Sequence, residues 1–258
     1  MRNIARRLDN CEKIAKEREI FLRHELPNPD DLLSDFLQFT KYFYHLRTGR
    51  DFIISSPPSR MSHHLIIANK FNDIYSGKAS RSLIHCPPRY GKTELMIHFI
   101  AWTLAKFPDS QYIYISYALR LAAKQTGIIR QIVSSPEYRK LFNVKVRSDS
   151  RAKDSFETTA GGAVFASGSG GTITGYGAGV ANVDRWGGAI AIDDIHKPGE
   201  VTSDTIREGE VEWYLEIARQ LDKRLADSMT LENDDGGVEG LSQSDNCPMC
   251  GQDWSGTL

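Results

Sequence analysis

The chain has 258 residues, of which 40% are hydrophobic, and a formal net charge of −1, the profile of a soluble globular protein. Its longest apolar stretch falls short of the roughly 18 residues that a membrane-spanning helix needs, so we expect no membrane partner and a cytoplasmic location. Four cysteines are too few and too unevenly spaced for a disulfide framework. They are Cys11, Cys86, Cys247 and Cys250.

Charge is distributed unevenly along the chain. Residues 225–258 contain seven acidic residues and no Lys or Arg, which leaves 32 basic and 26 acidic residues, a net charge of +6, in residues 1–224. A mildly basic body is compatible with a polyanionic partner, and ordinary surface charge explains it equally well. The acidic segment is poor in apolar residues and predicts a disordered tail.

The first third of the chain predicts helices. A charged helix is expected over residues 2–24, and a second one, rich in aromatic residues, begins at Asp30 and continues to residue 46. A third helix precedes Gly77, a residue typical of the position after a helix end. We therefore expect an N-terminal helical region over residues 1–78.

From residue 79 the pattern changes to alternating strands and helices. Helices are expected over residues 93–107 and 119–135, between short apolar runs that predict strands. The predicted strands lie at residues 82–86, 112–116, 163–167 and 187–194, the last of them ending in two aspartates. Such alternation indicates an α/β domain with a mostly parallel sheet covered on both faces. The expected organisation is this domain over residues 79–224 and the acidic tail over 225–258.

The segment HCPPRYGKTE, residues 85–94, lies between a predicted strand and a predicted helix. Its Gly91-Lys92-Thr93 matches the end of the phosphate-loop pattern G-x-x-x-x-G-K-[ST], although Cys86 occupies the position of the first glycine. In such a loop, main-chain N–H groups surround a phosphate at a helix N-terminus. Lys92 can reach the terminal phosphates and the Thr93 hydroxyl can bind Mg²⁺. A Gly-Lys-Thr triplet alone is common by chance.

A second motif follows the last predicted strand. The run AIAIDD ends in Asp193 and Asp194. Asp193 can complete a Mg²⁺ site, and Asp194 can orient or polarise an attacking water. A solvated acidic turn is the alternative for this motif taken singly. Both motifs, in the correct order and separated by strand–helix units, favour nucleotide binding.

Several ordered segments resemble the ATPase part of the large terminase subunit of tailed bacteriophages, over about residues 35–215. PPRYGKTE resembles that family's variant phosphate loop (Walker A), in which Pro-Pro-Arg precedes Gly-Lys-Ser/Thr. SPEYRKLF at 135–142 resembles the segment after its second core strand, and the glycine-rich residues 165–179 resemble the loop before its Walker B strand. Residues 187–198, GGAIAIDDIHKP, resemble the Walker B strand and the following turn.

The resemblance implies a P-loop NTPase fold of the ASCE, RecA-like type and a magnesium-dependent ATP hydrolase that drives double-stranded DNA into a procapsid. It places the protein in the cytoplasm of an infected bacterial cell, as a homo-oligomer working with a portal and a small terminase subunit. Lys92 and Thr93 would bind phosphate and Mg²⁺, and Asp193 would complete the metal site. The residues expected to contact the nucleotide are Pro88, Arg89, Tyr90, Gly91, Lys92, Thr93 and Glu94.

Three residues are candidates for catalysis in addition to Lys92. Asp194 stands where many relatives of the fold carry a catalytic glutamate, which is one methylene longer. Arg89 lies within the loop and can stabilise charge that develops on the γ-phosphate, as an arginine finger does. Arg185 could act similarly towards a neighbouring subunit, but a surface role on a loop is the preferred interpretation. Thr174 and Gly175 belong to a glycine-rich stretch that is either a mobile loop near the nucleotide or DNA, or an ordinary surface loop.

The resemblance ends before the part of the family that cuts DNA. Only 64 residues follow Asp194, too few for a nuclease domain with its own core, so we expect a truncated or split terminase without nuclease activity. Cys247 and Cys250 form half of a zinc-ribbon pattern, and we expect no zinc within one chain because a structural site needs four ligands. Two alternatives stay open: another DNA-stimulated P-loop ATPase, or a non-catalytic nucleotide-binding remnant.

Overall fold

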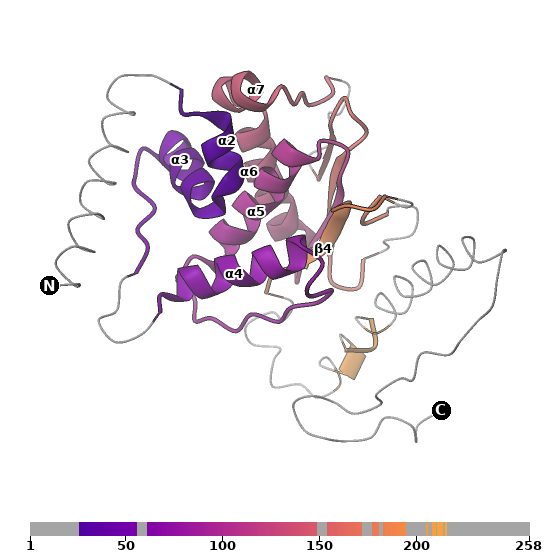
Figure 1. Cartoon of the computed structure of the whole chain (residues 1–258). Coiled ribbons are helices and arrows are strands. Elements are labelled where there is room, and N and C mark those ends of the chain that lie inside the picture. Colours follow the sequence, from indigo (N-terminus) through magenta and orange to yellow (C-terminus); the bar gives the residue numbers. More distant parts are fainter. Residues whose placement is uncertain are drawn as a thin grey trace, which may run out of the picture. The chain divides into compact units, whose positions relative to one another are not determined.

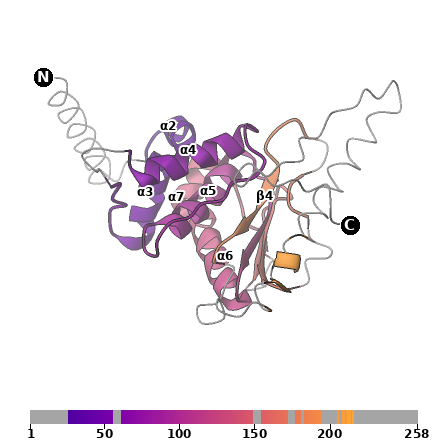
Figure 2. The same ribbon diagram turned by 90° about the horizontal axis from the view of Figure 1, so that it is seen from below.

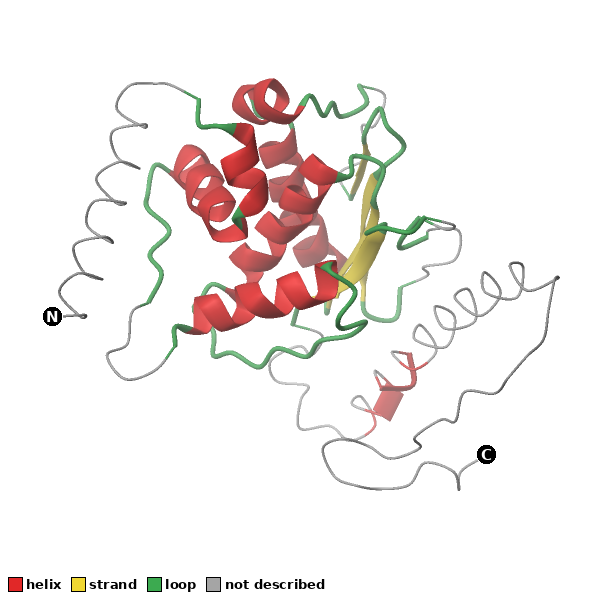
Figure 3. Ribbon diagram, in the orientation of Figure 1, coloured by secondary structure: helices red, strands yellow, loops and turns green. Residues whose placement is uncertain are grey.

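The computed structural model describes residues 26–55, 61–148, 154–171, 177–180, 183–194 and several positions between 205 and 215. Helices form a layer on one side of a small sheet (Figures 1 and 3). The helix expected over residues 2–24 and the acidic tail over 225–258 lie outside the described residues. None of the helices in the described part is both long and apolar enough to cross a membrane.

The aromatic-rich helix that the sequence predicted as one element is two helices. They are α2 (Pro29–Ser34) and α3 (Phe36–Thr48), separated by Asp35, whose backbone is extended. The Asp35 carboxylate accepts hydrogen bonds from the main-chain N–H groups of Leu37 and Gln38 at 2.9 and 3.1 Å. It thus caps α3, which is how a short polar side chain competes with helix continuation.

Two further helices frame the candidate phosphate loop. α4 (His63–Tyr75) ends shortly before Gly77, as the sequence predicted, and Gly77 has a left-handed φ of 73°. α5 (Lys92–Lys106) begins directly after the loop and is almost wholly buried beyond its first turn. Its expected existence and position are confirmed.

The N-terminal helices and α5 share one core. The Phe36 ring of α3 lies 5.9 Å from the Phe71 ring of α4 and 5.9 and 5.7 Å from the Phe99 and Trp102 rings of α5. The Trp102 indole N–H donates to the main-chain oxygen of Leu32 in α2 at 3.0 Å. Because these side chains are buried together, the helices that precede the loop are fixed relative to it.

The sheet has four strands in the order β2-β3-β1-β4. β1 (Gln111–Ser116) pairs in parallel with β3 (Ala163–Gly168) and with β4 (Gly188–Ile192), and β2 (Ser155–Glu157) pairs antiparallel with β3. The chain is therefore α/β with a mostly parallel, mixed sheet, as expected, although β2 was not predicted.

The helix α6 (Leu119–Val133) connects β1 to the rest of the sheet and is followed by α7 (Pro136–Phe142). α5 and α6 pack on the sheet face that carries Tyr112 and Tyr114 (Figure 2). Ile113 and Ile115 alternate to the opposite face and are buried too. Both faces of the central strand are thus removed from solvent.

The strand expected at residues 82–86 does not form. These residues have no regular secondary structure, Leu83 is 79% exposed, and none of the described strands pairs with them. An apolar run becomes a strand only where a neighbour supplies ladder hydrogen bonds. In the described part of the sheet, β4 has β1 as its only neighbour, so the run leads into the candidate phosphate loop as an unpaired segment.

Pairing at the end of β4 fixes the two aspartates. The Asp193 N–H donates to the Ile115 main-chain oxygen at 2.9 Å, and the Tyr117 N–H donates to the Asp194 oxygen at 3.0 Å. At the other end of the strand, Gly188 lies so close to β1 that a Cβ would stand 1.9 Å from the Gln111 carbonyl oxygen. The register therefore places both carboxylates at the carboxyl edge of the parallel strands, where ligand sites of open α/β sheets lie.

Candidate functional site

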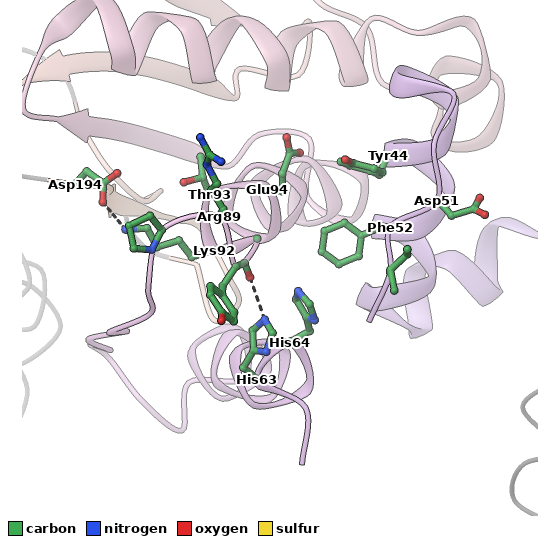
Figure 4. A pocket seen from close by; sticks show the side chains of 14 residues that line it. Tyr44, Asp51, Phe52, His63, His64, Arg89, Lys92, Thr93, Glu94 and Asp194 are labelled. Atoms are coloured by element: carbon green, nitrogen blue, oxygen red, sulfur yellow. Dashed lines mark hydrogen bonds and ion pairs between the residues drawn. The ribbon is translucent and has the colours of Figure 1, made fainter. Parts of the chain in front are cut away.

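A cavity of about 590 Å³ opens where the loop, α5 and the end of β4 meet (Figure 4). One half is lined by residues 88–94 and by Asp194. The other half is lined by side chains of the N-terminal helical region: Tyr44, Asp51, Phe52, Ile53, His63 and His64. Every residue expected to contact the nucleotide, from Pro88 to Glu94, lies on this cavity.

The loop backbone is arranged so that donors are left free at the start of α5. Arg89 and Gly91 have left-handed φ angles of 66° and 80°, and no side chain caps the helix. Within the described residues, the N–H groups of Gly91, Lys92 and Thr93 donate no hydrogen bond to the protein. Unpaired N–H groups at a helix N-terminus, together with the helix dipole, favour an anion.

Lys92 and Asp194 form an ion pair across this site, between Nζ and Oδ1. The lysine Nζ also lies 4.0 Å from Oδ1 of Asp193. Partial burial lowers the pKa of Lys92, but the hydrogen bond and charge of Asp194, with the charge of Asp193, outweigh it and hold that pKa above its ordinary value. The loop lysine is therefore charged and faces the paired aspartates.

Thr93 and Asp193 make the second contact between loop and strand. The Thr93 hydroxyl donates to Asp193 Oδ2 at 2.7 Å, and the Asp193 side chain is buried. Two hard oxygen groups at this distance suit Mg²⁺, which binds few protein ligands and keeps several waters. Among the described residues there is no group of three or more His, Cys, Asp and Glu side chains that could hold a metal ion, so a cation here would depend on Thr93, Asp193, water and phosphate oxygens.

Tyr114 belongs to the site although the sequence did not single it out. It lies on β1, and its hydroxyl donates to the same Asp193 oxygen at 3.1 Å. Burial, and next the negative charge of Asp193, raise the pKa of Tyr114 far above its ordinary range, so the phenol stays protonated and a donor. The alternation in YIYIS places Tyr112 and Tyr114 on one face, but only the register with β4 brings Tyr114 to the carboxylate.

Glu94, which lines the cavity, also forms an ion pair with a residue of the N-terminal helices. Its Oε2 accepts from Nη2 of Arg47 on α3 at 2.6 Å. Arg47 is mostly buried and Glu94 about one third exposed. The pair therefore anchors the first turn of α5 to α3, a role that the spacing of 47 residues in the sequence could not reveal.

The two candidate arginines lie in different places. Arg89 lines the cavity beside Lys92 and Thr93 (Figure 4). Arg185 forms an ion pair with Asp109 at 2.5 Å, and its guanidinium lies 4.8 Å above the Phe107 ring. Asp109 precedes β1 and Arg185 precedes β4, so the pair lies at the opposite end of these strands from Asp193. Arg185 therefore does not line the cavity of its own chain.

Some predicted residues lie outside the described part of the chain. They are Thr174, Gly175, Cys247 and Cys250. Comparisons of the chain with protein-family models, with curated proteins and with solved structures give no match. Its function must therefore be inferred from its residues and their geometry.

Proposed function

We propose that the chain binds Mg²⁺–ATP in this cavity and hydrolyses it. One observation carries the proposal: Lys92 and Thr93 contact Asp194 and Asp193, about a hundred residues further along the chain, at one edge of a mostly parallel sheet. Each motif taken alone could be a chance occurrence. Their contact is the arrangement that a phosphate loop and a metal-binding strand end require.

The loop supplies the phosphate contacts in this proposal. The N–H groups at the start of α5 and the Lys92 ammonium bind the β- and γ-phosphates, because a triphosphate competes for the lysine better than the exposed Asp194 carboxylate does. Lys92 thereby exchanges one anionic partner for another. Arg89, on the rim of the same cavity, adds positive charge near the γ-phosphate.

Thr93 and Asp193 supply the metal contacts. The hydroxyl and the buried carboxylate can hold Mg²⁺ directly or through a water once their mutual hydrogen bond opens. When bound, Mg²⁺ would neutralise charge on the β- and γ-phosphate oxygens.

Release of Asp194 from Lys92 prepares it for the hydrolytic step. The carboxylate then orients a water whose oxygen attacks the γ-phosphorus, while the bond from that phosphorus to the β–γ bridging oxygen breaks. The proton of the water passes through Asp194 to phosphate, and the bridging oxygen leaves on ADP. The products are ADP and inorganic phosphate, and Asp194 returns to its pairing with Lys92.

The other half of the cavity has the composition of a pocket for the base. Tyr44 and Phe52 present aromatic rings 5.3 Å apart, and both line the cavity. An apolar, aromatic wall beside a charged phosphate site is typical of sites for nucleotides and cofactors. The N-terminal helical region would then form part of the nucleotide site.

Hydrolysis with and without double-stranded DNA tests this function. Lys92→Ala should abolish phosphate release while leaving the thermal unfolding transition in place, and Lys70→Ala, at an exposed position of α4, should retain wild-type turnover. Asp193→Asn should release no phosphate, and added magnesium should not restore the activity. Turnover retained by Lys92→Ala would contradict the assignment of the site.

The biological task that we propose for the hydrolysis is packaging of double-stranded DNA into a procapsid. The support is the resemblance of the loop and Walker B segments to the large terminase subunit, with a mildly basic body. Stimulation of turnover by double-stranded DNA of any sequence is expected, because contacts to phosphates carry no base information. Stimulation restricted to single-stranded DNA would favour another DNA-dependent ATPase, and binding of portal protein or small terminase subunit would favour packaging.

A second candidate, nucleotide binding without turnover, is favoured by the pairing of Asp194 with Lys92. If the pair persists when nucleotide binds, the acid cannot orient water. Binding of a fluorescent ATP analogue by wild-type protein, with no release of phosphate at any DNA concentration, would select this candidate.

A further inference from the structure

Two neighbouring histidines at the start of α4 contact the phosphate loop. Nε2 of His63 lies 3.1 Å from the main-chain oxygen of Tyr90, and the rings of these two residues lie 5.2 Å apart (Figure 4). A carbonyl oxygen can only accept, so the His63 Nε2 carries the proton and donates. α4 thus holds a main-chain group of the loop through a side chain.

Ser55 fixes the orientation of both imidazole rings. Its hydroxyl lies 3.0 Å from Nδ1 of His63 and 2.9 Å from the hydroxyl of Ser62. Its main-chain N–H donates to Nδ1 of His64 at 3.1 Å. With every Nδ1 engaged, the Nε2 atoms of both rings are directed to the loop.

His64 packs against the glycine of the loop. It is buried, and its Nε2 would lie 3.1 Å from a Cβ on Gly91. Burial, and next the neighbouring His63, lower the pKa of His64 against the opposite effect of a hydrogen bond with the Tyr90 main chain, so the pair does not carry two positive charges near neutral pH. The His64 ring therefore provides a close, neutral wall behind Gly91, and His63 provides the directed donor.

The direction of one peptide plane links this contact to the nucleotide. The Tyr90–Gly91 peptide is trans, so its N–H points away from the side on which its carbonyl meets His63. That N–H is among those without a partner in the described residues. Because Arg89, which carries a Cβ, has a left-handed φ angle, a loop of this shape needs support from its surroundings.

We propose that His63 is a positioning residue of the phosphate loop: its Nε2–H holds the Tyr90 carbonyl so that the N–H groups of Gly91 and the following residues face the phosphates. This inference rests on the proposed binding of a nucleotide in the cavity. The helical region before the loop therefore shapes the phosphate half of the site directly. A loop with Cys86 in place of its first glycine, followed by Pro87 and Pro88, would obtain part of its shape from α4.

The test compares two amides that differ in reach. In His63→Gln the amide nitrogen takes the place of Nε2 and keeps the bond to Tyr90, whereas the shorter side chain of His63→Asn reaches only the place of Nδ1. We expect His63→Asn to weaken binding of a fluorescent ATP analogue by about tenfold, or 1.4 kcal/mol. His63→Gln should stay within about threefold of wild type, as should Lys70→Asn, an exposed control on α4.

The binding measurements are accompanied by thermal unfolding of the nucleotide-free proteins. The unfolding temperature should be the same for wild type and all variants, because His63 is partly exposed. Wild-type affinity in His63→Asn, or equal loss in both amide variants, would overturn the positioning role while leaving the nucleotide site intact. Failure of the wild-type protein to bind the analogue would instead overturn the proposed function, and this inference with it.

Discussion

Tyr114 and Thr93 donate to the same carboxylate oxygen of Asp193, at 3.1 and 2.7 Å. The two donors come from β1 and from α5, so the aspartate is held between the sheet and the helix that begins at the candidate phosphate loop. In the proposed function, once a cation takes the place of the Thr93 proton, the Tyr114 bond would keep the carboxylate oriented. Tyr114 would therefore act on the proposed metal site through Asp193 rather than by contact with the nucleotide.

Tyr114→Phe should raise the magnesium concentration required for half-maximal hydrolysis by about tenfold, because loss of an outer hydrogen bond commonly weakens metal affinity by this order. Turnover at saturating magnesium should change less. The measurement is phosphate release as a function of magnesium concentration at saturating ATP.

Tyr112→Phe is the matched control for that experiment. It lies two residues earlier on the same face of β1, but its hydroxyl bonds with Thr103 and Trp186, away from Asp193. It should lower stability by about 1 kcal/mol and leave the magnesium dependence unchanged. Equal shifts in both variants would mean that packing of β1, and not the bond to Asp193, sets the metal affinity.

The Arg47–Glu94 pair predicts an energetic link between α3 and the first turn of α5. Because Arg47 is largely buried, with 14% of its side chain exposed, and the contact is a charged hydrogen bond of 2.6 Å, we expect a coupling energy of about 1–2 kcal/mol. It is obtained from urea unfolding of Arg47→Met, Glu94→Gln and the double variant.

The exposed pair Arg147–Glu157 serves as comparison, with about half of each side chain in solvent. Its coupling energy should be at most about 0.5 kcal/mol, the usual size for a surface ion pair. If the two cycles gave the same value, the Arg47–Glu94 contact would be an ordinary surface bridge without a part in holding the loop.

Local sequence patterns were sufficient for the elements whose burial is repetitive. α5 and α6 follow from apolar residues at helical spacing, and β1, β3 and β4 from short apolar runs. The meeting of Lys92 with the aspartates was predictable as well, since a loop before a helix and the carboxyl end of a parallel strand lie at one edge of such a sheet.

The misses have a common physical origin in contacts between distant residues. The run at 82–86 looks like a strand, but no described strand pairs with it. Conversely, β2 is only three residues long and exists because it pairs with β3. Tyr114 and Arg47 have no local motif, and their roles arise from register and helix packing.

His98 predicts how stability depends on pH. It is fully buried on α5, its Nδ1 donates to the Glu94 carbonyl at 2.7 Å, and its Nε2 has no partner in the described part of the chain. The pKa of His98 is lowered to about 4, because burial and the charge of Arg47 together outweigh the hydrogen bond to the Glu94 carbonyl, which raises it. In the unfolded chain the pKa is about 6.5.

Between these two pKa values the unfolded state binds more protons than the folded state, so the free energy of unfolding falls as pH falls from about 6.5 to 4. The expected loss from His98 alone is about 3 kcal/mol, complete below pH 4. His98→Leu should remove this component, because an apolar side chain leaves no buried acceptor and no group to protonate. The measurement is urea unfolding of both proteins at several pH values. Subtracting one free energy of unfolding from the other removes the contribution of the other histidines, which both proteins share. The free energy of unfolding of the wild type should fall by about 3 kcal/mol relative to that of His98→Leu between neutral pH and pH 4. Curves parallel over this range would show that His98 takes up its proton equally in the folded and unfolded chain.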